Sequence, residues 1–134
     1  MSPPPAGARH PFQYAVLRVV PLIERGECLN AGVVVHCRSL AFLAATVGLV
    51  DSLLQSLAPA LDVEPVRHHL EALPRIAAGD TGAGPIAALD QAQRFHWLVA
   101  PSSTVIQASA VHTGLSVDPA RALDHLFARL VLRS

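Results

Sequence analysis

The chain has 134 residues, enough for one domain with a substantial core, and its ten basic and ten acidic residues give a net charge of zero. All ten basic residues are arginines scattered along the chain, which excludes the basic stripe typical of nucleic-acid-binding proteins. No apolar segment has the length of a membrane span or the pattern of a signal peptide. Because the basic stripe and the apolar span are both missing from the sequence, we expect neither a nucleic-acid nor a membrane partner.

The apolar content is high for a soluble domain. Hydrophobic residues make up 51% of the chain, charged residues make up 15%, and the mean hydropathy is +0.41. A domain of this size normally keeps large apolar patches off its surface. We therefore expect a second subunit to cover part of the surface, as a homodimer or as another protein partner. The segments 50–57 and 118–132 are the expected contact regions.

Prolines cluster in the first eleven residues, which predicts a disordered tail at 1–12 ahead of a single domain at 13–134. Cys28 and Cys37 are the only two cysteines. They fall in one apolar run whose extended length would hold them roughly 30 Å apart, too far for a disulfide. Two reduced thiols are typical of a cytoplasmic protein.

Three strands are predicted in the first third of the chain. Apolar residues on both faces of the segment 13–20 predict a buried central strand that ends at Pro21. A β-branched run predicts a second strand at 28–37, and a third is expected at 40–46. Because the polar turn at 24–27 is short, we expect the first two strands to pair antiparallel.

The apolar period changes to that of helices in the middle of the chain. It predicts a short helix at 50–57 and a second helix that begins after an Asp62 cap and is kinked or closed by Pro74. The glycine-rich stretch 79–84 is expected to be a flexible joint. A third helix is then expected from Pro85 to about Arg94.

Extended structure is expected again at 95–100 and 104–109. Asp118 and Pro119 match the N-cap and the first position of a last helix. Strands grouped at the two ends of the chain around a helical middle predict an α+β fold, with an antiparallel or mixed sheet packed against three to four helices.

No recognisable catalytic motif is present. The seven histidines lack the spacing of zinc ligands, since His68 and His69 are adjacent and there is no C-x-x-C or H-E-x-x-H. The glycine-rich stretch lacks P-loop spacing, and no serine or cysteine stands in a nucleophile motif. We expect no metal and no cofactor, and the sequence leaves open whether the protein is an enzyme.

Six polar residues could form a site, and two interpretations of them remain open. They are Arg18, Glu27, Asn30, Arg94, Gln107 and His112. Arg18 lies inside an apolar strand, where an unpaired guanidinium would be costly, and Glu27 is the nearest carboxylate. We favour a buried ion pair with hydrogen-bonded amides. The alternative is a pocket whose arginines bind a nucleotide, a phosphate or a carboxylate.

Two blocks of residues carry a family resemblance. The first is Tyr14, Arg18, Pro21, Glu24, Gly26, Glu27, Asn30, Gly32 and Val33. The second is Arg94–Leu98, Pro101, Ser103–Val105, Gln107, Ser109, Val111–Gly114 and Asp118–Pro119. Together they resemble the family known as domain of unknown function 3037, over most of the chain after the tail.

This resemblance implies no established activity, cofactor or catalytic residue. Similar small proteins are often encoded beside HipA-like kinases. The resemblance therefore favours a non-catalytic interaction or regulatory module, with a HipA-like kinase as a candidate partner, over a stand-alone enzyme.

Overall fold

The computed structural model describes residues 7–21, 27–49, 51–101 and 105–132, and it confirms an α+β fold with an antiparallel sheet. The strands are β1 His10–Val19, β2 Leu29–Cys37, β3 Phe42–Val47, β4 Ile106–Ala108 and β5 His112–Ser116. The α-helices are α1 Asp51–Leu57, α2 Val63–Ala77, α3 Gln91–Val99 and α4 Pro119–Phe127. None of the helices in the described segments has both the length and the apolar character that a bilayer crossing requires.

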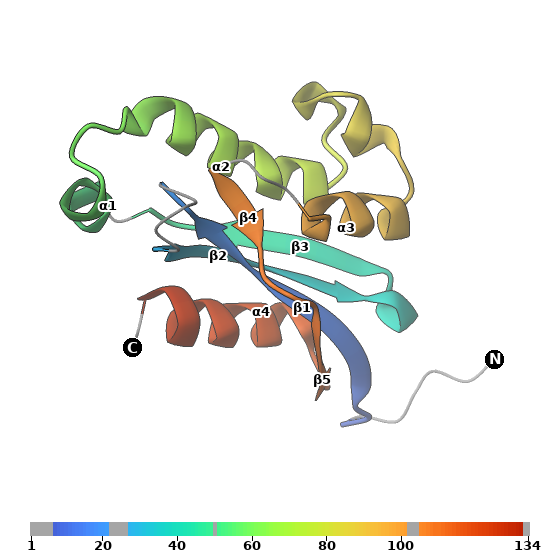
Figure 1. The fold of residues 1–134 in the computed structure, drawn as a ribbon. Helices are drawn as coiled ribbons and strands as arrows, with labels where there is room; N and C mark the ends of the chain where they lie inside the picture. The colour runs from blue at the N-terminus through green and yellow to red at the C-terminus, as the bar shows by residue number, and fades with distance from the viewer. Residues whose placement is uncertain (1–6, 22–26, 50, 102–104, 133–134) are drawn as a thin grey trace.

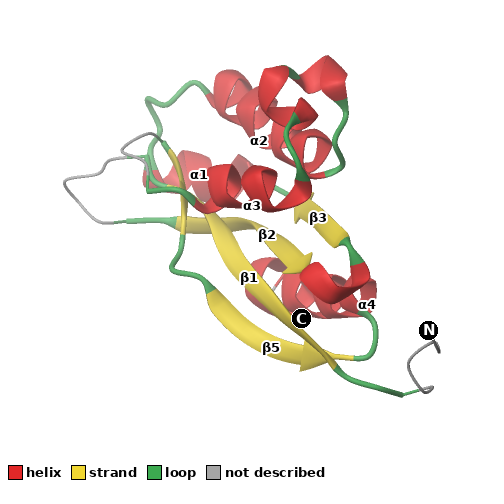
Figure 2. Ribbon diagram, turned by 90° about the vertical axis from the view of Figure 1, so that its right-hand side faces the viewer, coloured by secondary structure: helices red, strands yellow, loops and turns green. Residues whose placement is uncertain are grey.

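β1 is the centre of the sheet, as its two apolar faces predict. One edge of β1 pairs antiparallel with β2, which confirms the expected pairing, and β2 pairs in turn with β3. The other edge of β1 is shared, because β4 pairs with residues 17–19 and β5 pairs with residues 10–14. Strands from both ends of the chain therefore belong to one sheet, with β5 running along the outer side of β1 (Figure 2).

Helices cover both faces of this sheet (Figure 1). Helices α1, α2 and α3 lie on one face, where their buried apolar side chains belong to one core cluster with Leu17 of β1. Helix α4 lies on the opposite face, where Leu123 belongs to the same buried cluster as Val33 and Val35 of β2. Successive residues of a strand point to opposite faces, so a strand between two helical layers can bury nearly every side chain. This explains why β1 and β2 are apolar on both faces.

Aspartates cap the helices at the predicted positions. The Asp62 carboxylate accepts a hydrogen bond from the backbone N–H of Glu64 at the start of α2. Asp118 does the same for Ala120 at the start of α4, which confirms the predicted cap. Helix α2 continues for three residues past Pro74, so the helix is not closed by this proline.

The segment 95–100, expected to be extended, is instead helical up to Val99, within α3. Asp90 and Gln93 form a capping box, in which each side chain accepts a hydrogen bond from the other residue's backbone N–H. The two buried positions of the helix, Phe95 and Leu98, are three residues apart, as one face of a helix requires. The prediction of a strand was wrong because it followed the strand propensity of the aromatic residues instead of this spacing.

The third helix consequently begins later than predicted. Residues Pro85–Ala88 form only a 3-10 turn before α3. The glycine-rich stretch expected to be a flexible joint contains a second 3-10 turn, Thr81–Ala83. The Asp80 carboxylate organises that turn, because it accepts hydrogen bonds from the Gly82 backbone and from the Arg75 guanidinium of α2. An ordered connection therefore leads from α2 towards α3.

The sequence did not predict β5, because its residues lack apolar alternation and include a glycine. Gly114 is needed there, since a Cβ at this position would lie 2.6 Å from Cζ of Phe12 on β1. The strand expected at 104–109 is the shorter β4.

Some predicted segments are only partly described. β1 begins at His10, so the sheet includes residues 10–12 of the expected tail. Residues 1–6 of that tail and residues 24–26 of the predicted turn lie outside the described residues. The sheet therefore begins three residues before residue 13, where the domain was expected to begin.

Two adjacent leucines of α1 test this packing. The side chain of Leu54 is fully buried, whereas 43% of Leu53 is exposed. We expect Leu54→Ala to lower the free energy of unfolding by about 2–5 kcal/mol, because it removes core contacts and leaves a cavity. Leu53→Ala should cost about 1 kcal/mol or less. Urea titrations of the two variants measure both values, and equal costs would contradict the placement of α1 on the sheet.

Candidate functional site

Three of the six candidate residues lie side by side across the sheet. Arg18 of β1 stands opposite Asn30 of β2 on one side and Gln107 of β4 on the other. The register between β1 and β2 shifts between Leu17 and Arg18, which brings Asn30 to this position. Arg18 and Phe12 are six residues apart on β1, so their side chains lie on the same face of the strand. Phe12 belongs to the buried cluster that packs against α4.

Arg18 is paired with an amide. Its Nε donates a hydrogen bond to Asn30 Oδ1 at 3.4 Å, and Asn30 Nδ2 donates to the carbonyl oxygen of Leu130 at 3.0 Å. Asn30 thereby connects the two central strands to Ala128–Leu132, a π-helical turn that follows α4.

We expected Arg18 to form an ion pair with Glu27, but among the described residues Arg18 is hydrogen-bonded to Asn30. The register shift places Asn30 opposite Arg18, while Glu27 lies ahead of the first residue of β2. Arg18 is also only half-buried, so water can hydrate part of the guanidinium and a carboxylate is not required. Glu27 is half-buried as well.

Arg94 lies in another layer, on α3, where it ties backbone segments together. Its guanidinium donates to the carbonyl oxygen of Leu89 at 2.6 Å and to that of Ala77, the last residue of α2, at 3.4 Å. Gly79, just after α2, has a φ of +78°, a conformation that favours glycine, and the Arg94 guanidinium lies beside it, 3.5 Å from where a Cβ would be. Two nitrogen atoms of the side chain therefore satisfy backbone carbonyl groups, one of them at the end of α2, while its Nε is buried without a hydrogen-bond partner among the described residues.

His112 lies on β5, opposite Tyr14 of β1, and the centroids of the two rings are 5.4 Å apart. Tyr14 and Arg18 are separated by four residues of strand, or roughly 13 Å. The exposed His112 is thus far from the row formed by Arg18, Asn30 and Gln107. The six candidates therefore do not converge in one cleft, because Arg94 and His112 lie on other elements than this row.

The histidines and cysteines do not gather into a site either. Within the described segments, no group of three or more His, Cys, Asp or Glu side chains could hold a metal ion. Both cysteines are free, with Cys28 exposed and Cys37 buried. Ser39 Oγ lies 3.2 Å from His10 Nδ1, but no carboxylate among the described residues is hydrogen-bonded to this histidine. The pair thus lacks the orienting group of a catalytic triad.

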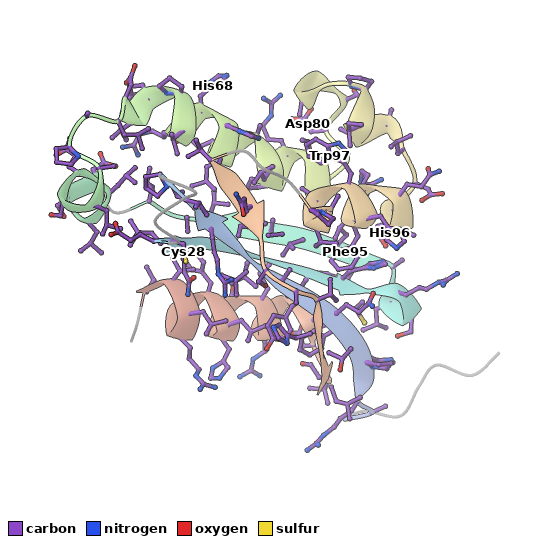
Figure 3. The ribbon with its side chains drawn as sticks, viewed as in Figure 1. Cys28, His68, Asp80, Phe95, His96 and Trp97 are labelled. Carbon is purple, nitrogen blue, oxygen red and sulfur yellow. The ribbon has the colours of Figure 1, made fainter. Side chains whose placement is uncertain are left out.

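His36 is a buried histidine in the core between β2 and α3. Its ring lies 4.9 Å from the ring of Phe95, which points from α3 towards the sheet (Figure 3). Burial lowers the pKa of the His36 imidazole, and the positive charges of Arg38 and His96 lower this pKa further. The neutral ring is the form that suits the fold.

Two hollows in the surface were not indicated by the sequence. The first, which we call the β5 groove, has a volume of about 400 Å³ and lies between β5 and α4. Its lining residues are Phe12, Leu115, Ser116, Val117, Asp118, Arg121, Ala122, His125 and Leu126. The second, which we call the Trp97 pocket, has a volume of about 280 Å³. Its lining residues are Leu17, His69, Leu73, Trp97, Leu98, Ala100, Pro101, Ile106 and Ala108.

Large apolar side chains are exposed beside both hollows. Leu115 is 63% exposed, Val117 is 51% exposed and Trp97 is 42% exposed. Sequence patterns identify apolar residues but do not show which of them remain uncovered, because coverage depends on the tertiary packing of other elements. The one residue in the sequence that could have drawn attention to the second hollow is Trp97, the single tryptophan of the chain.

The hydrogen bonds of Asn30 can be tested against those of Arg18. Asn30→Ala should lower the free energy of unfolding by about 1–3 kcal/mol, because it leaves the Leu130 carbonyl without its donor. Arg18→Met keeps an apolar stem of similar length and should cost less. Denaturant titrations measure both effects. A larger loss for Arg18→Met would show that the guanidinium, and not the amide, holds this part of the sheet.

The depressed pKa of His36 predicts a pH dependence of stability. Below the ordinary value of 6.5 the unfolded state binds the proton more readily than the folded state, so stability should fall as the pH drops through this value. His36→Phe removes this titration. Its unfolding free energy should therefore fall less than that of the wild type between about pH 7.5 and pH 5. Parallel pH profiles for the two proteins would contradict the prediction.

Comparison with known proteins agrees with the resemblance carried by the two blocks of residues. A family model described as "Protein of unknown function (DUF3037)" matches residues 14–131, a range that contains every helix and strand from β2 to α4. A search of curated proteins and a search of solved structures each found no significant match. The chain therefore belongs to the DUF3037 family of proteins of unknown function.

Proposed function

We propose that the protein is a non-catalytic interaction module that extends its sheet through β5, and that its first partner is a second copy of the same chain. The observation that carries this proposal is the exposed edge at β5, where Leu115 and Val117 are 63% and 51% exposed. Figure 2 shows β5 as the outer strand along one half of β1, with no described element beyond it.

β5 lacks the features that usually protect an edge strand. Lysine, proline and bulges are common protections because each of them hinders pairing with another strand. β5 contains no charged residue and no proline, and its register with β1 is continuous from His10 to Tyr14. The backbone groups on its outer side are therefore available to another strand.

The opposite edge of the sheet differs from β5. β3 is the terminal strand on that side, and both α2 and α4 pack against it. All six of its residues are buried or half-buried, whereas three of the five residues of β5 are exposed. The fold thus covers one edge strand from both faces and leaves the other open, which favours β5 as the contact surface.

A twofold axis suits this strand. Antiparallel pairing of two β5 strands around Gly114 would set His112 of each copy opposite Ser116 of the other, with Thr113 opposite Leu115. The pairing joins uncharged residues only, so no like charges meet. A single surface serves both copies, as expected for a symmetric dimer. The β5 groove, with Val117 and the first turns of α4, adds an apolar area beside the strand.

This surface refines the contact regions expected from the sequence. Among residues 51–57, the part of this segment that the structure describes, Leu54 is buried in the core and only Leu53 is an exposed large apolar residue, so α1 offers little contact area. The segment 118–132 contributes to the β5 groove through Arg121, Ala122, His125 and Leu126. In the proposed dimer, α4, at the start of the segment 118–132, therefore lies beside the β5 contact.

A HipA-like kinase is the heterologous partner that we propose to test, with the resemblance to small proteins encoded beside such kinases as its support. A cytoplasmic setting is part of the same proposal, because the exposed and free Cys28 suits a reducing compartment. Co-expression of the kinase with the wild-type protein and with Leu115→Lys tests this pairing. A complex of unchanged amount with the variant would exclude β5 as the surface that binds the kinase.

Self-association is tested by sedimentation velocity at micromolar concentration, where we expect a dimer. Leu115→Lys places a charge on the edge and should weaken the dimer at least tenfold in Kd, or about 1.4 kcal/mol. Leu132→Lys is the matched control, since Leu132 is 59% exposed but lies after α4. It should leave the dimer unchanged. A monomeric wild type would overturn self-association, and a dimer broken only by Leu132→Lys would move the interface to the end of the chain.

A further inference from the structure

We propose that the Trp97 pocket is a binding site for a small, uncharged aromatic molecule. The pocket lies between α2, α3, β1 and β4, and none of its lining residues belongs to the β5 groove. This proposal therefore does not depend on the proposed function.

The floor of the pocket is preformed by the core. Leu17, Leu73, Leu98 and Ile106 come from four different elements, and each of them is 7% exposed or less. Side chains packed this tightly are held by their neighbours, so they cannot collapse to fill the hollow. The pocket is therefore part of the architecture of the sheet and its helices, and a ligand would need no rearrangement to reach the apolar floor.

The rim carries two aromatic rings with polar atoms. Trp97 stands on α3 (Figure 3), and His69 stands on the neighbouring α2. Trp97 is 42% exposed, although a tryptophan gains free energy by burying its large ring. An aromatic ligand would cover the exposed part of the indole by stacking against it. The Trp97 indole and the His69 imidazole are the only two lining side chains with hydrogen-bonding nitrogen atoms.

Size and charge define the class of ligand. Pockets for small ligands have volumes of about 300–1,000 Å³, and a cavity of about 150 Å³ accepts benzene. At about 280 Å³, the Trp97 pocket suits one ring or two fused rings. Its nine lining residues include no Asp, Glu, Lys or Arg, so a charged group would lose hydration without gaining a carboxylate, ammonium or guanidinium of opposite charge. An uncharged aromatic molecule with one hydroxyl group fits both conditions.

The experiment is a titration followed by two-dimensional ¹H–¹⁵N NMR. Because the chain has one tryptophan, the indole N–H gives a single resonance that reports on the pocket directly. We expect 4-methylphenol to shift this resonance and the amides of residues 106–108 saturably, with a Kd below about 1 mM. The charged analogue 4-methylbenzoate should bind at least about tenfold more weakly.

Two variants localise the binding. Ala108→Phe fills the pocket and should weaken binding of 4-methylphenol at least about tenfold, whereas the same change at the exposed Ala88, outside the pocket, should leave binding unchanged. Trp97→Leu is a second test that keeps the buried floor intact, and it should weaken binding at least about fivefold when followed by the Ile106 amide.

The results that would overturn the proposal are distinct from those for the dimer. No saturable shift at any soluble concentration would exclude an aromatic ligand. Equal binding of 4-methylbenzoate would show that the pocket does not select against a charged group, which contradicts the proposed ligand class. Full binding by both Ala108→Phe and Trp97→Leu would place the ligand elsewhere. None of these outcomes changes the expected effect of Leu115→Lys on self-association, because Leu115 lines the β5 groove.

Discussion

Ser109 completes the hydrogen bonding of β1 at the point where its neighbour changes from β4 to β5. Its hydroxyl accepts the backbone N–H of Val16 at 2.9 Å, and its own N–H donates to the Val16 carbonyl at 2.8 Å. Both residues are buried, so an unpaired Val16 N–H would carry a desolvation penalty. This contact lets two short strands act as one long partner for β1, and it fixes where β5 forms the outer edge.

The continuous β1 explains how the chain uses its high apolar content. Paired on both edges and covered by helices on both faces, β1 and β2 bury apolar side chains in two separate clusters. A large share of the apolar residues is therefore internal and needs no partner. The exposed remainder includes Leu115, Val117 and Trp97. These residues lie on the two surfaces for which we propose a binding partner: a second copy of the chain at β5 and a small aromatic molecule at Trp97.

Local signals in the sequence predicted much of the fold. The antiparallel β1–β2 pair followed from a short connection, and the Asp62 and Asp118 caps followed from residue type and spacing. The bounds of α3 were predicted wrongly because strand propensity was followed instead of the helical spacing of Phe95 and Leu98, whereas β5 was missed because it forms against β1 despite weak propensity. Of the candidate site, the row of Arg18, Asn30 and Gln107 lies together. The carboxylate partner expected for Arg18 was chosen by its closeness along the chain, whereas the described residues show Arg18 hydrogen-bonded to Asn30, which the register shift places opposite it.

Hydrogen exchange of the β5 amides, measured by mass spectrometry or NMR at increasing protein concentration, tests the central claim most directly. In an antiparallel pair to β1, alternate amides of His112–Ser116 point away from β1. The account predicts that these outward amides exchange more slowly as the concentration rises, while exchange in α3 stays constant. Exchange rates in β5 that are independent of concentration would contradict it, because they would show that no second strand pairs with this edge.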